Sequence, residues 1–353
     1  MHKALIIIKE ALKRKRLKAL LVTNIKNIRY LSGFTGSTAL LLITQKRDFF
    51  ITDFRYKEQS LREVRGFEII IPKGKPLTVV KKILKGLDIK KIGFEVTAPY
   101  SLYASLKKEL KPVPTEHLVE KAREIKEQGE IKLIKEAVFR AERAFQQIKP
   151  RIRKGVTERS IALRLEEAIK RLGSKRLPFD IIVASGENSA LPHAGVTNRR
   201  LRAGDLVVID WGAEADGYFS DMTRTFLLKG PDTEKKIKIY NIVLKANKRA
   251  LKEAKPAMPA KELDARARDI IKEAGYGEFF GHGTGHGVGL DIHEAPRISF
   301  LSKDVLKEGM VFTIEPGIYL SGIGGVRIED MVYLTSKGAR VLTSLPKDLE
   351  ILG

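Results

Sequence analysis

Residues 281–294 read GHGTGHGVGLDIHE, with glycine at every odd position from 281 to 289. Three of the six histidines of the chain, His282, His286 and His293, lie in this stretch. Alternating glycine leaves one face of an extended segment without side chains, so another group or a ligand can approach the backbone closely. The opposite face then presents His282, Thr284 and His286 in a row. Because glycine weakens a strand interior and buried imidazoles need partners, the pattern indicates a functional site.

The composition indicates a two-domain protein without disulfides. The chain has 353 residues, of which 43% are hydrophobic, and this length suits two domains. The absence of cysteine excludes disulfides, thiolate zinc sites and a cysteine nucleophile. The N-terminal stretch lacks the small-residue cleavage site of a signal peptide, and no apolar run approaches the roughly 18 residues needed to cross a bilayer. We therefore expect a cytoplasmic protein without a membrane partner.

The net charge of +23 is large and unevenly distributed. Residues 1–120 hold 25 Lys and Arg against 11 Asp and Glu, a net of +14. Such a field could attract nucleic acid or an anionic membrane. A surface rich in Lys and Glu, of the kind found on hyperthermophile proteins, accounts for the charge more simply. A nucleic-acid partner is therefore not the favoured expectation.

Alternating strands and helices predict an α/β domain over residues 1–119. In this domain we expect helices at 2–20, 58–64, 77–84 and 100–110, strands at 20–23, 68–71 and 91–94, and a hairpin of 39–43 with 48–52. A pattern of Lys and Glu at i,i+4 spacing predicts a linking helix over 120–148, which opens a second domain over 120–353. The second domain is expected to contain helices at 158–172, 234–253 and 260–274.

Two predicted hairpins of the second domain each carry a pair of acidic residues. Asp210 and Asp221 flank a turn at 214–217, and Glu315 and Glu329 flank a glycine-rich turn at 321–325. If each turn lies midway between its acids, the two carboxylates of a pair face each other with Cβ atoms about 5 Å apart. The flanking residues are apolar, which indicates burial, and buried unpaired carboxylates are costly.

Four buried carboxylates and a histidine favour a pair of divalent cations, held roughly 3.5–4 Å apart and bridged by carboxylates. Ligation dominated by oxygen, with one nitrogen, favours Mn²⁺, Co²⁺ or Fe²⁺ over a closed structural zinc site. Two metal ions can share a hydroxide that is a nucleophile at neutral pH and can stabilise the oxyanion of a tetrahedral intermediate. This chemistry suits hydrolysis of an amide.

At these residues the sequence resembles the pita-bread metallopeptidases, the family of prolidase, aminopeptidase P and methionine aminopeptidase. The motifs that carry the resemblance over residues 126–353 are IDWGAEADGYFSDMTRTF, GHGTGHGVGLDIHE, FTIEPGIYL and GGVRIED. In the first domain, NIRYLSGFTGSTALLLIT and FFITDFRY resemble the creatinase-type domain that prolidases carry and methionine aminopeptidases lack. The resemblance implies an α/β creatinase-like domain followed by an α+β pita-bread catalytic domain with a curved, mainly antiparallel sheet. It also implies a homodimer with two divalent metal ions per subunit, for which Mn²⁺ or Co²⁺ is expected.

The resemblance further implies a role for each candidate metal ligand. Asp210 would chelate the first metal ion, and Asp221 and Glu329 would bridge the two ions. His286 and Glu315 would bind the second ion. Glu315 would also accept a proton from the bridging water, whose hydroxide attacks the scissile carbonyl.

Other residues are implied to bind the substrate or to support the ligands. His193 and His293 would bind the substrate and stabilise the developing oxyanion. Arg297 would bind the C-terminal carboxylate of the substrate, for which a bidentate guanidinium is well suited. His282 would lie near the mouth of the site, and Arg327 would hydrogen-bond a ligand carboxylate.

The implied reaction is hydrolysis of the X–Pro bond. The proline nitrogen has no N–H and its ring fixes φ, so a pocket with an apolar wall can select it; Phe179, Ile292 and Tyr319 are candidates for that wall. A carboxylate clamp at Arg297 disfavours longer substrates, so the favoured function is an X-Pro dipeptidase acting on proline-containing dipeptides. Two alternatives remain: an X-Pro aminopeptidase acting on longer peptides, and a non-catalytic pita-bread protein that binds a partner through its basic surface.

Overall fold

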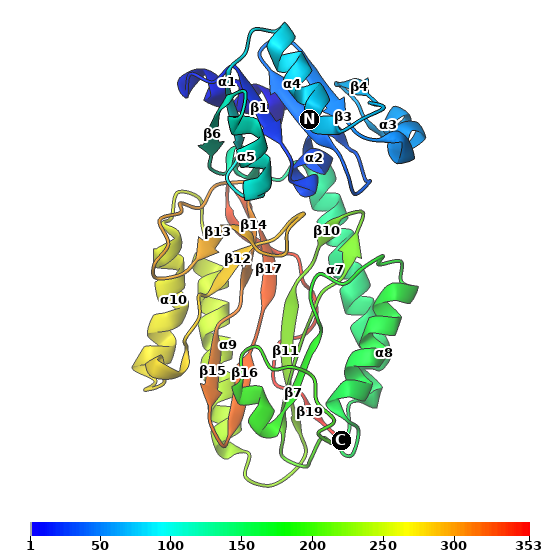
Figure 1. The fold of residues 1–353 in the computed structure, drawn as a ribbon. Coiled ribbons are helices and arrows are strands. Elements are labelled where there is room, and N and C mark those ends of the chain that lie inside the picture. The colour runs from blue at the N-terminus through cyan, green and yellow to red at the C-terminus, as the bar shows by residue number, and fades with distance from the viewer. Residues whose placement is uncertain (1) are drawn as a thin grey trace. The chain divides into compact units, whose positions relative to one another are not determined.

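A computed structural model describes residues 2–353 of the chain. The residues form two compact units, of which one extends to Arg123 and the other runs from Glu124 to Gly353 (Figure 1). Over residues 2–353, no helix combines the length and the apolar character that a membrane span requires.

The N-terminal unit is a six-stranded mixed sheet with the strand order β4-β3-β2-β1-β5-β6. The strands of the predicted hairpin, β2 and β3, pair antiparallel, whereas β1 pairs parallel with β5. Side chains of β1 alternate between two hydrophobic clusters, with Leu20 and Val22 in one and Ala19 and Leu21 in the other. Both faces of the central strand are therefore covered, as expected of an α/β layer arrangement. The elements are β1 (Ala19–Val22), β2 (Leu40–Thr44), β3 (Asp48–Ile51), β4 (Glu68–Ile70), β5 (Lys91–Glu95), β6 (Lys111–Thr115), α1 (His2–Arg14), α2 (Ile25–Ser32), α3 (Lys57–Glu63), α4 (Pro76–Gly86), α5 (Tyr100–Lys107) and α6 (Leu118–Arg123).

The C-terminal unit repeats one order of elements: two helices, then strands that include a hairpin. The first half contains α7 (Gln128–Ile148), α8 (Glu158–Arg171), β7 (Ile182–Ser185), β8 (Leu206–Trp211), β9 (Glu214–Ala215), β10 (Tyr218–Phe219) and β11 (Met222–Leu228). The second half contains α9 (Glu234–Glu253), α10 (Ala260–Glu273), β12 (Gly285–Gly287), β13 (Glu294–Ile298), β14 (Val311–Ile314), β15 (Gly317–Leu320), β16 (Gly324–Arg327), β17 (Asp330–Thr335), β18 (Gly338–Val341) and the terminal β19 (Ile351–Leu352). Strand pairing in this unit is antiparallel except between β11 and β19, so the predicted fold class is confirmed.

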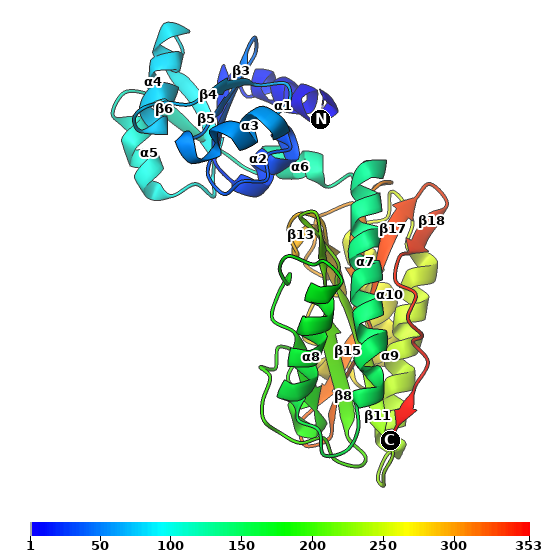
Figure 2. The same ribbon diagram turned by 90° about the vertical axis from the view of Figure 1, so that its right-hand side faces the viewer.

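Trp211 determines which face of β8 packs against the helices. Its fully buried indole donates a hydrogen bond to the carbonyl of Ala141 in α7 (3.0 Å) and stacks on Phe145 with ring centres 4.6 Å apart. Helices α7 and α8 lie along this half of the unit (Figure 2). Because successive side chains of a strand point to opposite faces, the anchoring of Trp211 turns the preceding Asp210 away from α7.

The predicted linking helix over 120–148 is two helices, α6 and α7, separated by residues 124–127. Glu127 has an extended backbone (ψ 163°) and forms a capping box with Glu130 at the start of α7. The backbone N–H of Lys126 donates to the carbonyl of Gly309 (2.9 Å) instead of to a helical carbonyl. The i,i+4 spacing of Lys and Glu continues across the break, because side-chain spacing alone does not show where the backbone hydrogen bonds of a helix begin or end.

Candidate metal centre

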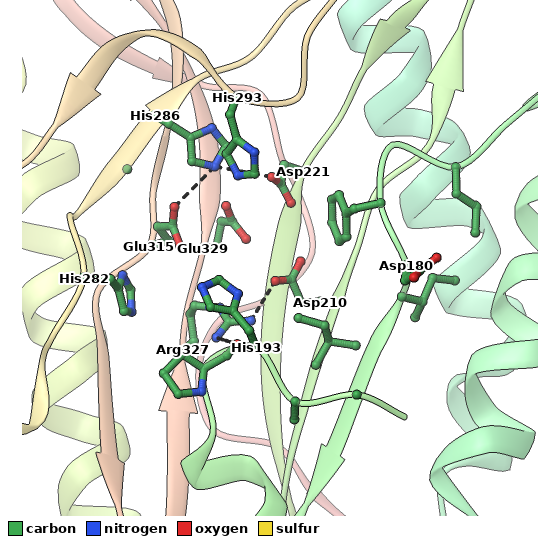
Figure 3. A pocket seen from close by; sticks show the side chains of 18 of the residues that line it. Asp180, His193, Asp210, Asp221, His282, His286, His293, Glu315, Arg327 and Glu329 are labelled. Atoms are coloured by element: carbon green, nitrogen blue, oxygen red, sulfur yellow. Dashed lines mark hydrogen bonds and ion pairs between the residues drawn. The ribbon is translucent and has the colours of Figure 1, made fainter. Parts of the chain in front are cut away.

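The acidic residues of the two hairpins converge where the two halves of the C-terminal unit meet. The backbone N–H of Glu329 donates to the carbonyl of Thr223 in β11 (3.1 Å), which joins the first half to the second. Figure 3 shows the carboxylates of Asp210 and Asp221 on one side of a shared space and those of Glu315 and Glu329 on the other.

The first hairpin differs from the prediction in its register. Asp210 pairs with Thr223 instead of Asp221, and Asp221 precedes β11. The centre of the turn lies one residue later than the midpoint between the two acids, at Asp216–Gly217, where both residues have positive φ (44° and 83°), as a two-residue hairpin turn of the I′ type requires. Asp210 and Asp221 are therefore diagonal neighbours on one face and are not directly opposite.

The second hairpin has the predicted register. Ile314 pairs with Asp330 on one side of the acidic pair, and Gly317 pairs with Arg327 on the other. The same register places Glu315 opposite Glu329, so their expected arrangement is confirmed. Asn247 of α9, which is fully buried, donates through Nδ2 to the carbonyls of Ile314 (3.1 Å) and Ile328 (3.2 Å) and so ties the two strands together just before these acids.

His286 lies on β12 and faces the carboxylates. Its Nε2 is 3.6 Å from Oδ2 of Asp221 and 3.4 Å from Oε1 of Glu315. Ligand atoms of Asp221, His286 and Glu329 all lie within 4.8 Å of one another. Burial lowers the pKa of His286, which favours the neutral imidazole that coordinates metals.

The glycines around His286 serve the packing of the protein's own strands. A Cβ at Gly285 would lie 2.0 Å from the carbonyl oxygen of Thr313 in β14, and one at Gly287 would lie 2.2 Å from that of Ala295 in β13. No larger residue fits there without moving backbone. By contrast, a Cβ at Gly281 would meet open space. The interpretation that the glycines leave a bare face for a ligand is therefore wrong for Gly285 and Gly287.

The chemistry of the donor set fits divalent cations. Oδ1 of Asp210 and Oδ1 of Asp221 are buried without a hydrogen-bond partner among the described residues. Burial, and then the charges of Glu329, Asp210 and Glu315, raise the pKa of Asp221 well above its ordinary value. Burial also raises the pKa of Glu315 and of Glu329. Clustered acids with unused oxygens are the ligands that Mn²⁺ and similar ions prefer, and a cation would relieve their mutual repulsion.

Arg327 links one of these acids to the rest of the site. Its Nη2 is 2.7 Å from Oδ2 of Asp210, and its Nη1 donates to the hydroxyl of Tyr319 (3.0 Å) and to the carbonyl of Pro192 (3.1 Å). Nε2 of His282 lies 2.9 Å from the same Tyr319 hydroxyl. The expected hydrogen bond from Arg327 to a candidate ligand is confirmed, and Asp210 is the partner.

The structure gathers the predicted metal ligands, the two substrate-binding histidines, Arg297, His282 and Arg327 around one cavity of about 1070 Å³. The rings of His293 and His286 meet edge-on with centres 4.2 Å apart, and burial lowers the pKa of His293. His193 and Arg297 are exposed to the cavity, His193 from a loop and Arg297 from β13 opposite His286. The cavity is lined by Asp210, Asp221, Glu315, Glu329, His286, His193, His293, Arg297, His282 and Arg327, together with an apolar wall that includes Leu163, Leu177, Phe179 and Ile181.

Some residues at the site were missed or misassigned from the sequence. Among the described residues that line the cavity, Phe179 is present but Ile292 and Tyr319 are not, so Tyr319 orients Arg327 and His282 and does not belong to the apolar wall. Thr223 was missed, although its hydroxyl donates to Oε2 of Glu329 (2.7 Å) and accepts from Nε of Arg327 (3.1 Å). A correct placement of the Asp-Gly turn would have identified Thr223 as the cross-strand partner of Asp210.

Comparisons with known proteins show which family the chain is similar to. Residues 132–336 match the model of Metallopeptidase family M24, and residues 7–125 match that of the Creatinase/Prolidase N-terminal domain. The chain is 41% identical over 350 residues to an Xaa-Pro dipeptidase of Pyrococcus horikoshii, covering 96% of each chain. Its fold superimposes on an Xaa-Pro dipeptidase from Bacillus anthracis with a TM-score of 0.97 (45% identity, 99% of each chain). It superimposes on an X-Pro aminopeptidase from Thermotoga maritima with a TM-score of 0.88 (42% identity, 95% of this chain and 98% of the other).

Proposed function

This chain belongs to metallopeptidase family M24, and from that premise we propose that it is an X-Pro dipeptidase that uses two divalent metal ions. The observation that carries the proposal is the cluster of buried acids and His286, placed beside a cavity that also contains His193, His293 and Arg297. Membership of a hydrolase family, with relatives that are Xaa-Pro dipeptidases, favours catalysis over the alternative of a non-catalytic binding protein.

The residues that would hold the ions are Asp210, Asp221, His286, Glu315 and Glu329, with Asp221 and Glu329 in the bridging positions. When bound, a pair of divalent ions supplies an activated water and polarises the scissile carbonyl. The unused oxygens of Asp210 and Asp221 support this assignment, as does the neutral state of His286 that its lowered pKa favours.

Glu315 is proposed as the proton acceptor. Burial raises its pKa, and a carboxylate whose pKa lies closer to the working pH both accepts and releases a proton more readily. The hydroxyl of Thr313 donates to its Oε1 (3.2 Å) and orients it toward His286.

His193 and His293 are proposed to bind the substrate and the oxyanion. They line the cavity on the sides next to the carboxylates. The lowered pKa of His293 keeps its ring neutral, so that one ring nitrogen can donate to an oxygen that becomes negative in the transition state.

Arg297 is proposed to bind the C-terminal carboxylate of a dipeptide. Its guanidinium is exposed on the wall of the cavity, and a paired hydrogen bond to a carboxylate is strong and directional. The likeness to the Thermotoga maritima X-Pro aminopeptidase keeps cleavage of longer peptides as the second candidate.

Two experiments test the proposed function. The first compares kcat/KM for an X-Pro dipeptide with that for X-Pro-Y tripeptides made from the same X. A preference for the tripeptides would refute the dipeptidase proposal and favour an X-Pro aminopeptidase. The second measures bound metal and X-Pro cleavage for Asp221→Asn and His286→Ala. Full activity and full metal content in both variants would refute the proposed metal centre.

We further propose Mn²⁺ or Co²⁺ as the native metal, a homodimeric state and a cytoplasmic location. Elemental analysis of protein purified without added metal identifies the ion. Sedimentation equilibrium gives the subunit number, and fractionation of the source cells gives the compartment.

A further inference from the structure

The loop that carries His193 has little regular structure to hold it in place. It leaves β7 at Ser185, forms one short 3-10 turn (Gly186–Ala190) and reaches Thr197 before the chain returns to β8. Residues 192–196 of this loop line the cavity. Backbone hydrogen bonds hold its C-terminal end on α8, from the N–H of Arg159 to the carbonyl of Thr197 and from the N–H of Glu158 to the carbonyl of Arg199 (both 3.1 Å), and side chains supply further hydrogen bonds.

Glu158 supplies these hydrogen bonds at both ends of the loop. It is the first residue of α8 and is fully buried (0% exposed). Its Oε1 accepts from the backbone N–H and the hydroxyl of Ser185 (both 2.7 Å) and from Nδ2 of Asn188 (3.1 Å). Its Oε2 accepts from the backbone N–H (3.2 Å) and the hydroxyl (2.5 Å) of Thr197. One carboxylate therefore closes the loop at its base.

The hydrogen-bond partners of Glu158 named above are all donors, which suits a carboxylate, since its oxygens accept. The position at the first turn of α8 also favours a negative charge, because the N-terminal end of a helix carries a partial positive charge. Arg199 adds a cation: its Nη1 donates to Oδ2 of Asp205 (2.6 Å) and to the hydroxyl of Ser185 (2.8 Å). The pKa of its guanidinium is raised first by Asp205 and then by the charge of Glu158. A glutamine side chain would turn an NH₂ group toward these donors.

The tip of the loop is held by the other half of the site. Nη1 of Arg327 donates to the carbonyl of Pro192 (3.1 Å), the residue directly before His193. The backbone N–H of Gly325 in β16 donates to the hydroxyl of Ser189 (2.8 Å). With its base fixed on α8 and its tip fixed on β16, the loop holds His193 at one position relative to Asp210, the other partner of Arg327.

From these contacts we infer that Glu158 is a positioning residue for substrate binding: by closing the base of the 185–197 loop, it holds His193 where the substrate binds. The inference rests on the proposed function, in which His193 contacts the substrate. Glu158 itself is not among the residues that line the cavity.

The test is Glu158→Gln, assayed by steady-state kinetics on an X-Pro dipeptide. We expect KM to rise about tenfold, the equivalent of about 1.4 kcal/mol of binding free energy, with kcat within about threefold and bound metal unchanged. An unchanged KM in folded, metal-loaded Glu158→Gln would overturn the inference.

A matched control separates positioning from general loss of stability. Glu142 of α7 is also buried (8% exposed), and it accepts hydrogen bonds from the hydroxyl of Ser344 (2.6 Å) and from the backbone N–H of Leu345 (3.0 Å). That segment does not line the cavity. Glu142→Gln is expected to lower the melting temperature and to leave KM unchanged; an equal rise in KM in both variants would attribute the effect to stability.

A double-mutant cycle tests whether Glu158 acts through His193. In a His193→Ala background, Glu158→Gln is expected to raise KM by less than twofold; independent, multiplicative effects would overturn the inference. If Glu158→Gln does not fold, Thr197→Val decides, since it removes one donor to Oε2 of Glu158 and is expected to raise KM about threefold. A wild-type protein that leaves X-Pro substrates intact refutes the proposed function, whereas active wild type with unchanged variants refutes only the positioning role.

Discussion

Replacing Asp221 with asparagine is expected to stabilise the protein in the absence of metal while weakening its metal binding. Asp221 is nearly fully buried (4% exposed) and its Oδ1 has no hydrogen-bond partner among the described residues. Its pKa is raised by burial and by Glu329, Asp210 and Glu315. An amide of the same shape removes one negative charge from this cluster and adds two donors for the remaining carboxylates.

The magnitude follows from the distance between the charges. One oxygen of Asp221 and one of Glu329 lie within 4.8 Å of each other, where two like charges repel by about 3 kcal/mol at an effective dielectric constant of roughly 20. Proton uptake by the acids, whose pKa values are raised, already relieves part of this repulsion. A net gain of about 1–2 kcal/mol is therefore expected, which raises the melting temperature of a unit of this size by about 2–8 °C.

The gain depends on pH. A carboxylate whose folded-state pKa lies above its unfolded-state value destabilises the folded protein as pH rises from the unfolded pKa through the folded one. The metal-free wild type is therefore expected to lose stability from acid toward neutral pH, and the advantage of Asp221→Asn is expected to shrink as the pH is lowered.

The assay is thermal unfolding of the C-terminal unit in excess EDTA and again with Mn²⁺. In EDTA at neutral pH, Asp221→Asn should unfold at a higher temperature than wild type, and with Mn²⁺ the order should reverse. Asp264 is a matched control, since it is equally buried (1% exposed) but bonded to Arg268 (2.7 Å) and Thr284 (2.8 Å), so Asp264→Asn should lower stability in both conditions. A lower melting temperature for Asp221→Asn in EDTA would refute the idea that the acids repel one another without metal.

Three further predictions concern substrate length, strand packing and metal affinity. Arg297→Ala should raise KM for X-Pro dipeptides about tenfold and for tripeptides much less, as measured by steady-state kinetics on both substrates. Equal increases in the two KM values would refute the binding of a dipeptide carboxylate by Arg297. In urea unfolding, Gly285→Ala should lower the free energy of unfolding by at least about 3 kcal/mol, because its Cβ would lie 2.0 Å from a backbone oxygen. Gly281→Ala should lower it by less than about 0.5 kcal/mol. Similar losses in the two variants would contradict the packing argument. Asn247→Leu removes two hydrogen bonds to the carbonyls just before Glu315 and Glu329. It should weaken Mn²⁺ binding by roughly tenfold in calorimetric titration. An unchanged affinity would show that Asn247 does not help to hold these candidate ligands.

The second hairpin was predictable because local signals agree on one register. The glycine-rich turn fixes the pairing of β15 with β16, and Phe312, Ile314, Val326 and Ile328 alternate along the flanking strands on the core face, so Glu315 and Glu329 could be placed opposite each other. In the first hairpin, the midpoint between two acids was taken as the turn, although Asp216–Gly217 is the stronger turn signal. That difference moved the partner of Asp210 from Asp221 to Thr223.

Helix α2 and the break before α7 show a second kind of limit. Asn24 caps α2 by accepting from the N–H of Lys26 (2.9 Å), and Gly33 ends it with φ 80°, so both signals were present in a stretch where no helix was predicted. The break before α7 combines a local signal, the capping box of Glu127 and Glu130, with the hydrogen bond from Lys126 to the carbonyl of Gly309. A partner that lies so far along the chain leaves no local trace in the sequence.

By itself, the sequence determined the two-domain organisation, the mainly antiparallel second domain and the acids and histidines of the site. The two domains and the acids follow from residue type and short-range spacing, which strand alternation and turn geometry convert into neighbours in space, whereas the mainly antiparallel sheet was implied by the resemblance to a family. Only the tertiary structure decided that Arg327 pairs with Asp210, that Gly285 and Gly287 make room for neighbouring strands, and that Glu158 closes the loop of His193. Each of these depends on segments distant in sequence being brought within a few ångströms, which is decided by the packing of one element on another.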